Sequence, residues 1–217
     1  MKSLWNALRK RCRFFKYKAA TYKISQDDIQ DDGINKPKKL HQIGVNSYYK
    51  PAISIFLPNL NGGGAEKNIL TLLEYFVKQN ISVDLVCTSH YGALREKVPR
   101  GVRYIVLDSG RVILSIPRYI SYLALARPQV VLSTLERANI VACIGKLLSS
   151  NKHKLVLRIE NSIFEPTIRP REIGRIFWIL LIVLFYRFAD EYICISHGLK
   201  RQMESLFKNR CNNISTI

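Results

Sequence analysis

The sequence predicts an α/β domain built on a doubly wound parallel sheet, preceded by a basic N-terminal extension. Short runs rich in Val, Ile and Leu alternate with stretches in which apolar residues recur at helical spacing. The short runs are apolar on both faces, as strands are when helices cover both sides of a parallel sheet. The hydrophobic fraction of 47% supplies enough apolar side chains for a sizeable core.

A strand, a glycine turn and a helix open the predicted domain. Residues 53–57 are a short apolar run that Pro58 ends. Three consecutive glycines follow within residues 61–67. Apolar residues then recur on one helical face, namely Ile69, Leu72, Leu73, Phe76 and Val77.

The rest of the chain continues the alternation. Further apolar runs predict strands at residues 83–88, 104–107, 130–133, 155–159, 192–195 and 214–217. Helices are expected at residues 113–126, 139–148, 171–188 and 199–207. The first of these stops before Pro128, because the residue that precedes proline is pushed out of the α region. Ligands of such a sheet bind beyond the carboxyl ends of its strands, so the residues that follow each strand are candidates for a site.

The helix predicted at 171–188 contains an apolar run at residues 176–185, flanked by Arg175 and Arg187. A bilayer span needs about 20 apolar residues, and this run is about half as long. We therefore expect a buried helix packed across the sheet. Partial insertion into a membrane interface is the alternative.

Residues 1–50 are predicted to be a basic extension and linker, and residues 51–217 the folded domain. The first 23 residues hold eight Lys and Arg, no acidic residue and several aromatic ones. No continuous apolar segment follows, so this is not a signal peptide. Two interpretations stay open: an amphipathic segment on an anionic membrane surface, or a solvated, disordered basic tail. Residues 25–50 carry Asp27, Asp28, Asp31, Asp32, Gly33 and Pro37 and have little apolar content, which is typical of a linker.

The net charge of +18 favours phosphate-rich partners, such as anionic lipids or nucleotide substrates. No motif of a sequence-specific nucleic-acid binder is present, so that class is not expected. The five cysteines include no CxxC pair, which indicates a reducing compartment without a disulfide framework or a cysteine zinc site. Cys87, Cys143 and Cys194 lie in apolar runs and are expected in the core.

The glycine turn is the main candidate for ligand binding. Glycines permit positive φ and close approach to the backbone, and the unpaired amides of the helix that follows favour a phosphate or a developing anion. Glu66 lies in the first helical turn, where it suits the helix dipole and is able to face a ligand. The turn is neither a P-loop nor a GxGxxG motif. A tight turn without a ligand is the alternative.

Four segments resemble the N-terminal domain of family 4 glycosyltransferases, which have the GT-B fold of two Rossmann-like domains. They are residues 57–67 with the Gly-Gly-Ala-Glu-Lys turn, 157–162, 188–198 and 212–217. The resemblance covers residues 53–217. It implies retaining transfer of a sugar from a nucleotide-sugar donor to a glycan or lipid-linked acceptor, without a cofactor or required metal. It also implies that this domain holds the acceptor while its glycine turn approaches the donor phosphates.

Carried onto this sequence, the resemblance predicts one cleft. Gly63, Gly64 and Glu66 would lie on one side of it, with Glu160 and Asn161 opposite. Many members have a histidine where this chain has Glu160-Asn161, so no catalytic residue is assigned. Arg158 is interpreted either as a phosphate-neutralising group or as an ordinary surface arginine, and His197 as a solvated loop residue. The predicted substrate-binding set is Asn61, Gly62, Gly63, Gly64, Glu66, Arg158, Glu160, Asn161 and Ser196.

The donor-binding second domain of the resembled family has no counterpart in the sequence, which ends where that domain would begin. We expect the chain to be a GT-B half-domain that is inactive alone: a fragment, a truncated gene product, or a subunit with a separate donor-binding partner. Its expected location is the cytoplasm, peripheral on the inner face of a membrane. The alternative function is a non-catalytic binding or interaction module that retains the fold. A nucleotide-dependent enzyme of another α/β class is a weaker third hypothesis.

Overall fold

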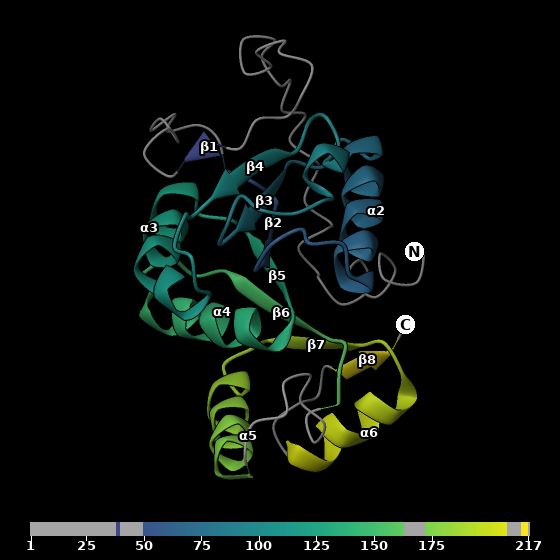
Figure 1. Cartoon of the computed structure of the whole chain (residues 1–217), viewed down its shortest axis with the longest axis vertical. Helices are drawn as coiled ribbons and strands as arrows, with labels where there is room; N and C mark the ends of the chain where they lie inside the picture. Colours follow the sequence, from purple (N-terminus) through teal and green to yellow (C-terminus); the bar gives the residue numbers. More distant parts are fainter. Residues whose placement is uncertain (1–37, 40–49, 163–171, 208–213, 217) are drawn as a thin grey trace.

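The computed structural model describes residues 38–39, 50–162, 172–207 and 214–216, which form one sheet flanked by helices (Figure 1). Within these residues the sheet has eight strands, all parallel, in the order β1-β4-β3-β2-β5-β6-β7-β8. The strands are β1 Lys38–Lys39, β2 Ile53–Leu57, β3 Val83–Cys87, β4 Arg103–Val106, β5 Val130–Thr134, β6 Lys154–Ile159, β7 Glu191–Cys194 and β8 Ile214–Thr216.

The chain builds the sheet outward from β2. It first adds β3 and β4 on one side, and then returns to place β5 on the other side and continues to β8. Ile53 is thus opposite Val83 in one neighbour and Val130 in the other. This reversal is a topological switch point, where doubly wound sheets bind their ligands at the carboxyl ends of the strands. The predicted doubly wound parallel sheet is confirmed.

Helices cover both faces of the sheet (Figure 1). Ile55 and Leu57 of β2 pack in the apolar cluster that includes α2, whereas Phe56 between them packs in the cluster that includes α3 and α4. This alternation follows from the period of two of a β-strand. The helices are α2 Gly64–Lys78, α3 Ile116–Ala126, α4 Glu136–Leu148, α5 Glu172–Tyr186 and α6 His197–Leu206, with short 3-10 helices η4 Arg95–Lys97 and η5 Ile113–Ser115.

Several element boundaries differ from the sequence-based expectation for identifiable reasons. The strand predicted to reach residue 88 ends at Cys87, because the Thr88 amide and hydroxyl both donate to the Pro58 carbonyl instead of continuing the strand. The helix predicted to begin at residue 139 begins at Glu136. Leu135 before it has φ +73°, a left-handed conformation that turns the chain sharply from β5 into α4.

The edge strand β1 belongs to the segment predicted as extension and linker. It pairs with β4, placing Lys38 opposite Ile105. Residues 1–37 and 40–49 lie outside the described residues, so the amphipathic and solvated-tail interpretations, and the boundary at residue 50, stay predictions.

Helix α5 is only half buried, so the expectation of a buried helix is wrong for one of its faces. Ile182 and Tyr186 are buried in the core. Ile176, Phe177, Leu180 and Leu184 are 45–61% exposed. Within the described part of the chain, no helix has both the length and the apolar character to span a bilayer.

The three described cysteines are buried thiols, as the sequence predicts. Burial raises the pKa of Cys87 to about 12 and that of Cys194 to about 11. A group whose thiolate is so disfavoured behaves as a small apolar side chain. Cys12 and Cys211 lie outside the described residues.

Candidate functional site

The glycine turn lies at the carboxyl end of β2 and leads directly into α2. Gly62 has φ +112°, where a side chain would be strained, and Gly63 precedes the first residue of α2. A Cβ added at Gly63 would lie 2.5 Å from a Glu66 carboxylate oxygen, so the Glu66 side chain folds back over the start of its own helix. This negative charge stabilises the positive end of the helix dipole. An incoming phosphate would therefore compete with Glu66 for that position.

A cluster of polar side chains lies at the ends of β5 and β6. Arg158 is buried and forms an ion pair with Glu160, and the Thr134 hydroxyl donates to the same Glu160 oxygen. Burial lowers the pKa of Arg158, and the Glu160 carboxylate partly opposes this shift. The interpretation of Arg158 as an ordinary surface arginine is wrong. Its charge balances Glu160 and holds that carboxylate in place.

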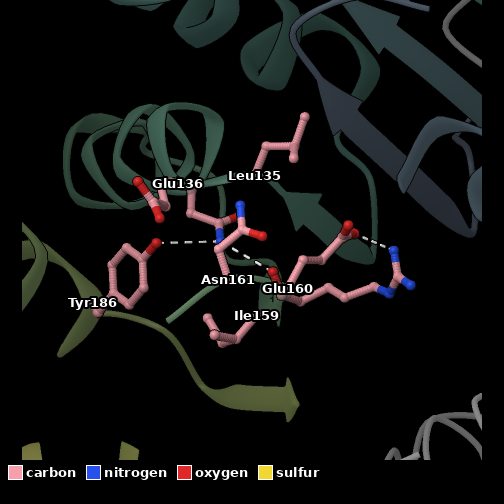
Figure 2. Close-up of a pocket in the computed structure, with 8 residues that line it drawn as sticks. Leu135, Glu136, Ile159, Glu160, Asn161 and Tyr186 are labelled. Carbon is pink, nitrogen blue, oxygen red and sulfur yellow. Dashed lines mark hydrogen bonds and ion pairs between the residues drawn. The ribbon is translucent and has the colours of Figure 1, made fainter. Parts of the chain in front are cut away.

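A small cavity opens beside this ion pair. It measures about 10 Å³, close to the room that one water-sized group needs. Figure 2 shows Glu136 of α4 and Tyr186 of α5 on one side, with Glu160 and Asn161 following β6. Its lining residues are Leu135, Glu136, Asn139, Arg158, Ile159, Glu160, Asn161 and Tyr186.

Glu136 lines the cavity and is hydrogen-bonded to helix α5. The indole Nε1 of Trp178 donates to Glu136 Oε2 at 3.1 Å, and the Arg137 guanidinium lies 5.9 Å from the Trp178 ring centre. Burial raises the pKa of Glu136, and the Trp178 hydrogen bond and the charge of Arg137 oppose the shift to a smaller extent. Because Leu135 occupies a sparsely populated backbone region, the start of α4 stores local strain beside this carboxyl group.

The raised pKa of Glu136 predicts a pH-dependent effect of replacing it. Between the unfolded and folded pKa values the native state binds more protons, so the Glu136 contribution to stability falls as pH rises through this window. Glu136→Gln should therefore raise the melting temperature at pH 7, and this gain should disappear below the ordinary glutamate range. Thermal unfolding of both proteins across pH tests this. A gain that is equally large at acidic pH would contradict it.

The structure unites some of the predicted site residues and separates others. Arg158, Glu160 and Asn161 line one cavity, whereas none of the glycine-turn residues does. The turn follows β2 and Glu160 follows β6, with β5 between these strands, so both lie on the same edge of the sheet. Ser196 instead caps α6, accepting a hydrogen bond from the Leu199 amide at 3.3 Å. The backbone amide of the exposed Asn61 donates a hydrogen bond to Asn59 Oδ1 at 3.1 Å.

The predicted substrate-binding set does not contain Glu136, Asn139 or Tyr186, although Glu136 is one of the candidate residues that follow a strand. Glu136 follows β5 by two residues, so its position at the carboxyl edge is a signal that the sequence contains. Asn139 lies one helical turn further along α4, and its amide donates to the Arg158 carbonyl at 3.2 Å and to the Tyr186 hydroxyl at 3.4 Å. Tyr186 comes from α5, and only the tertiary structure brings it to this place.

No group of three or more His, Cys, Asp or Glu side chains within the described ranges could hold a metal ion. His197 is exposed at the start of α6 beside Lys200, Arg201 and Glu204. The described part of this edge offers hydrogen bonding and charge: a glycine turn at a helix N-terminus, and a carboxylate held by an arginine and a threonine.

Comparisons with solved structures agree with this architecture. The lipopolysaccharide outer core galactosyltransferase WaaB aligns with a TM-score of 0.53 at 15% identity, over 75% of this chain and 44% of that chain. HepE of Anabaena, solved with UDP and glucose, aligns with a TM-score of 0.54 at 14% identity, over 77% of this chain and 44% of that chain. UGT2 of Phytolacca americana, with UDP-2fluoro-glucose and pterostilbene, aligns with a TM-score of 0.51 at 10% identity, over 77% of this chain and 53% of that chain. The chain thus spans about half the length of these proteins.

The sequence comparison identifies the family. None of the curated proteins compared with the chain matches it. The profile of Glycosyltransferase Family 4, however, matches residues 62–217, from the glycine turn to the last residue of the sequence. Since this match spans most of the chain and the fold agrees with it, the chain belongs to glycosyltransferase family 4 and is an N-terminal domain of the GT-B type.

Proposed function

We propose that the chain is the acceptor-holding half of an enzyme that transfers a sugar from a nucleotide donor to a glycan or lipid-linked acceptor. The observation that carries the proposal is the Glu160 carboxylate, fixed by Arg158 and Thr134 at the carboxyl edge of the sheet. A carboxylate held in this way is a strong acceptor for sugar hydroxyls. The glycine turn lies on the same edge, two strands away, where a donor in a facing domain would approach.

The complete reaction requires a second domain in this proposal. HepE carries UDP and glucose in a chain of which this one spans 44%. We infer that a donor-binding half, on the same polypeptide or on a partner subunit, supplies the nucleotide-sugar contacts. Transfer then depends on positioning acceptor and donor between two domains, which contributes to the rate without any further cofactor.

Binding measurements on the 217-residue chain test the acceptor role. The chain is applied to a glycan array, and the glycans it retains are titrated by NMR against the chain and its Glu160→Gln variant. We expect glycan binding that weakens about tenfold in the variant, because a charged acceptor is replaced by a neutral one. The matched control is Glu204→Gln on the exposed side of α6, which should bind as the parent does. Retention of no glycan, together with binding of a protein or nucleic acid, would instead favour an interaction module.

We also propose that the domain works on the cytoplasmic face of a membrane, with the exposed face of α5 against the lipid. Ile176, Phe177, Leu180 and Leu184 lie on this face, and the exposed Arg187 follows the helix. An apolar helix face beside cations matches the interface of an anionic bilayer, and the net charge of +18 adds attraction.

Vesicle sedimentation tests the membrane proposal. The parent chain should sediment with phosphatidylglycerol-containing vesicles at moderate salt. A Phe177→Asp/Leu180→Asp double variant should bind at least about tenfold more weakly, because two apolar side chains no longer enter the interface. The matched control is Leu147→Asp/Leu148→Asp. These leucines are similarly exposed but lie at the C-terminal end of α4 and not on α5. Equal weakening in both variants would contradict a specific role of α5.

A further inference from the structure

The cavity between α4, β6 and Tyr186 contains hydrogen-bonding atoms that no group of the described residues satisfies. Three of its lining residues each have one buried side-chain atom that finds no partner in the part of the chain that the structure describes: Glu136 Oε1, Asn139 Oδ1 and Arg158 Nε. Asn139 is 1% exposed and Arg158 is 5% exposed, so neither atom is compensated by bulk water. Leaving such groups unpaired costs about 1–3 kcal/mol each, which makes three around one small space a signal for an occupant.

Each of these side chains also makes at least one hydrogen bond or ion pair, so the three atoms are not loosely placed. Arg158 is fixed by its ion pair with Glu160, and Asn139 uses its amide group on the Arg158 carbonyl and the Tyr186 hydroxyl. Glu136 is held from the other side by Trp178. Each side chain is thereby oriented by at least one partner and has one further buried atom without a partner among the described residues.

The chemistry and size of the cavity define the occupant. Two of the atoms are acceptors and the third is a donor. The volume of about 10 Å³ admits one oxygen-sized group and excludes a sugar ring, a phosphate or a carboxylate. A hydroxyl group fits, because it donates to one of the two oxygens and accepts from the Arg158 Nε–H.

We propose that this cavity is a subsite for a single hydroxyl of the acceptor, read by Glu136, Asn139 and Arg158. Glu160 and Asn161 also line it, so a glycan bound to those residues would reach it with one hydroxyl group. The subsite rests on the proposed acceptor role and adds a specificity element to it. An acceptor without this hydroxyl would leave three buried polar atoms unpaired, which is how a site rejects a deoxy analogue.

Trp178 provides a direct readout of occupancy. The chain has two tryptophans, Trp5 and Trp178, and the indole of Trp178 contacts the same carboxyl group that lines the cavity. In a Trp5→Phe background, emission therefore reports Trp178 alone. A hydroxyl that engages Glu136 should change this emission, whereas a glycan that touches only Glu160 should not.

The test uses the Trp5→Phe chain with a bound methyl glycoside and its series of monodeoxy analogues. We expect one deoxy analogue to bind about tenfold more weakly or worse, and to lose the emission change. Asn139→Leu should weaken binding of the parent glycoside by a similar factor. This variant should then bind the parent glycoside and that deoxy analogue with equal affinity. Glu136→Gln, which still offers an oxygen, should restore most of the affinity that Glu136→Leu loses, and Glu204→Gln is the matched control.

Two outcomes would overturn the subsite but not the acceptor role. In the first, the glycosides bind and Glu160→Gln weakens them, but the Asn139 and Glu136 variants and every deoxy analogue bind as the parent does. The acceptor role then stands while the subsite falls. In the second, a crystal structure of the complex retains a water molecule on these three atoms with no ligand hydroxyl in contact, so that the cavity holds a structural water only. If no glycoside binds at all, both the acceptor role and the subsite fail.

Discussion

Replacing Arg103 by leucine is expected to lower the free energy of unfolding by about 3–5 kcal/mol, because it leaves a buried carboxylate without its counter-ion. Asp84, the second residue of β3, is completely buried. Arg103 of β4 binds both of its oxygens, with Nε at 2.8 Å and a terminal nitrogen at 2.6 Å. The Tyr122 hydroxyl also donates to Asp84, at 2.7 Å, and lies 2.9 Å from Ser54 Oγ.

Urea denaturation of the purified variants measures this effect. The double variant Asp84→Leu/Arg103→Leu should recover much of the loss, because it removes the charge together with its partner. Arg111→Leu, at an exposed arginine outside the sheet, should change stability by no more than about 0.5 kcal/mol. A loss below about 1 kcal/mol for Arg103→Leu would show that Tyr122 and its neighbours alone satisfy the carboxylate.

Replacing Arg158 by methionine should have the second largest effect, about 3 kcal/mol, and it should act at the candidate site. The variant removes the cation that holds Glu160 and leaves the Thr134 hydroxyl as the remaining described donor to that carboxylate. Glycan binding should fall with stability, because Glu160 would no longer be held in one orientation.

The combination Arg158→Met/Glu160→Gln separates the two roles of this arginine. Equilibrium unfolding should show stability largely restored in the double variant, since no uncompensated charge remains. Glycan binding should stay weak, because the carboxylate itself is missing. If the double variant were as unstable as Arg158→Met alone, packing of the long arginine side chain, and not its charge, would carry the effect.

Individual residues show which contacts of the candidate site are predictable from the sequence. Arg158 and Glu160 are two residues apart at a strand end, so their side chains fall on the same side and their pairing is accessible from sequence. Glu136 is accessible as a residue that follows a strand. The hydrogen bond from Trp178 to Glu136 joins residues 42 positions apart, and the contact of Asn139 with Tyr186 spans 47 positions. No local pattern encodes contacts at such separations, because they depend on how α5 packs on α4.

Ser196 shows how one sequence signal fits two roles, and its predicted binding role stays a prediction. Its position after β7 at the carboxyl edge fits a binding role, yet its hydroxyl oxygen accepts from the Leu199 amide and caps α6. Serine is a preferred residue at this capping position, so the same sequence signal serves local structure. The role of such a residue depends on where its hydrogen bonds go.

The sequence by itself determined the order of strands and helices, the parallel sheet and the place of the glycine turn, because these follow from short-range periodicity and backbone preferences. It did not determine which face of α5 is buried. The helix is apolar almost all round, and such a helix has no preferred inner face until its neighbours are placed. The tertiary structure decided this by packing Ile182 and Tyr186 into the core and leaving Phe177 and Leu180 exposed. The same packing brings Tyr186 and Trp178 to the Glu136 side of the cavity, where a hydroxyl-sized space with unpaired polar atoms results.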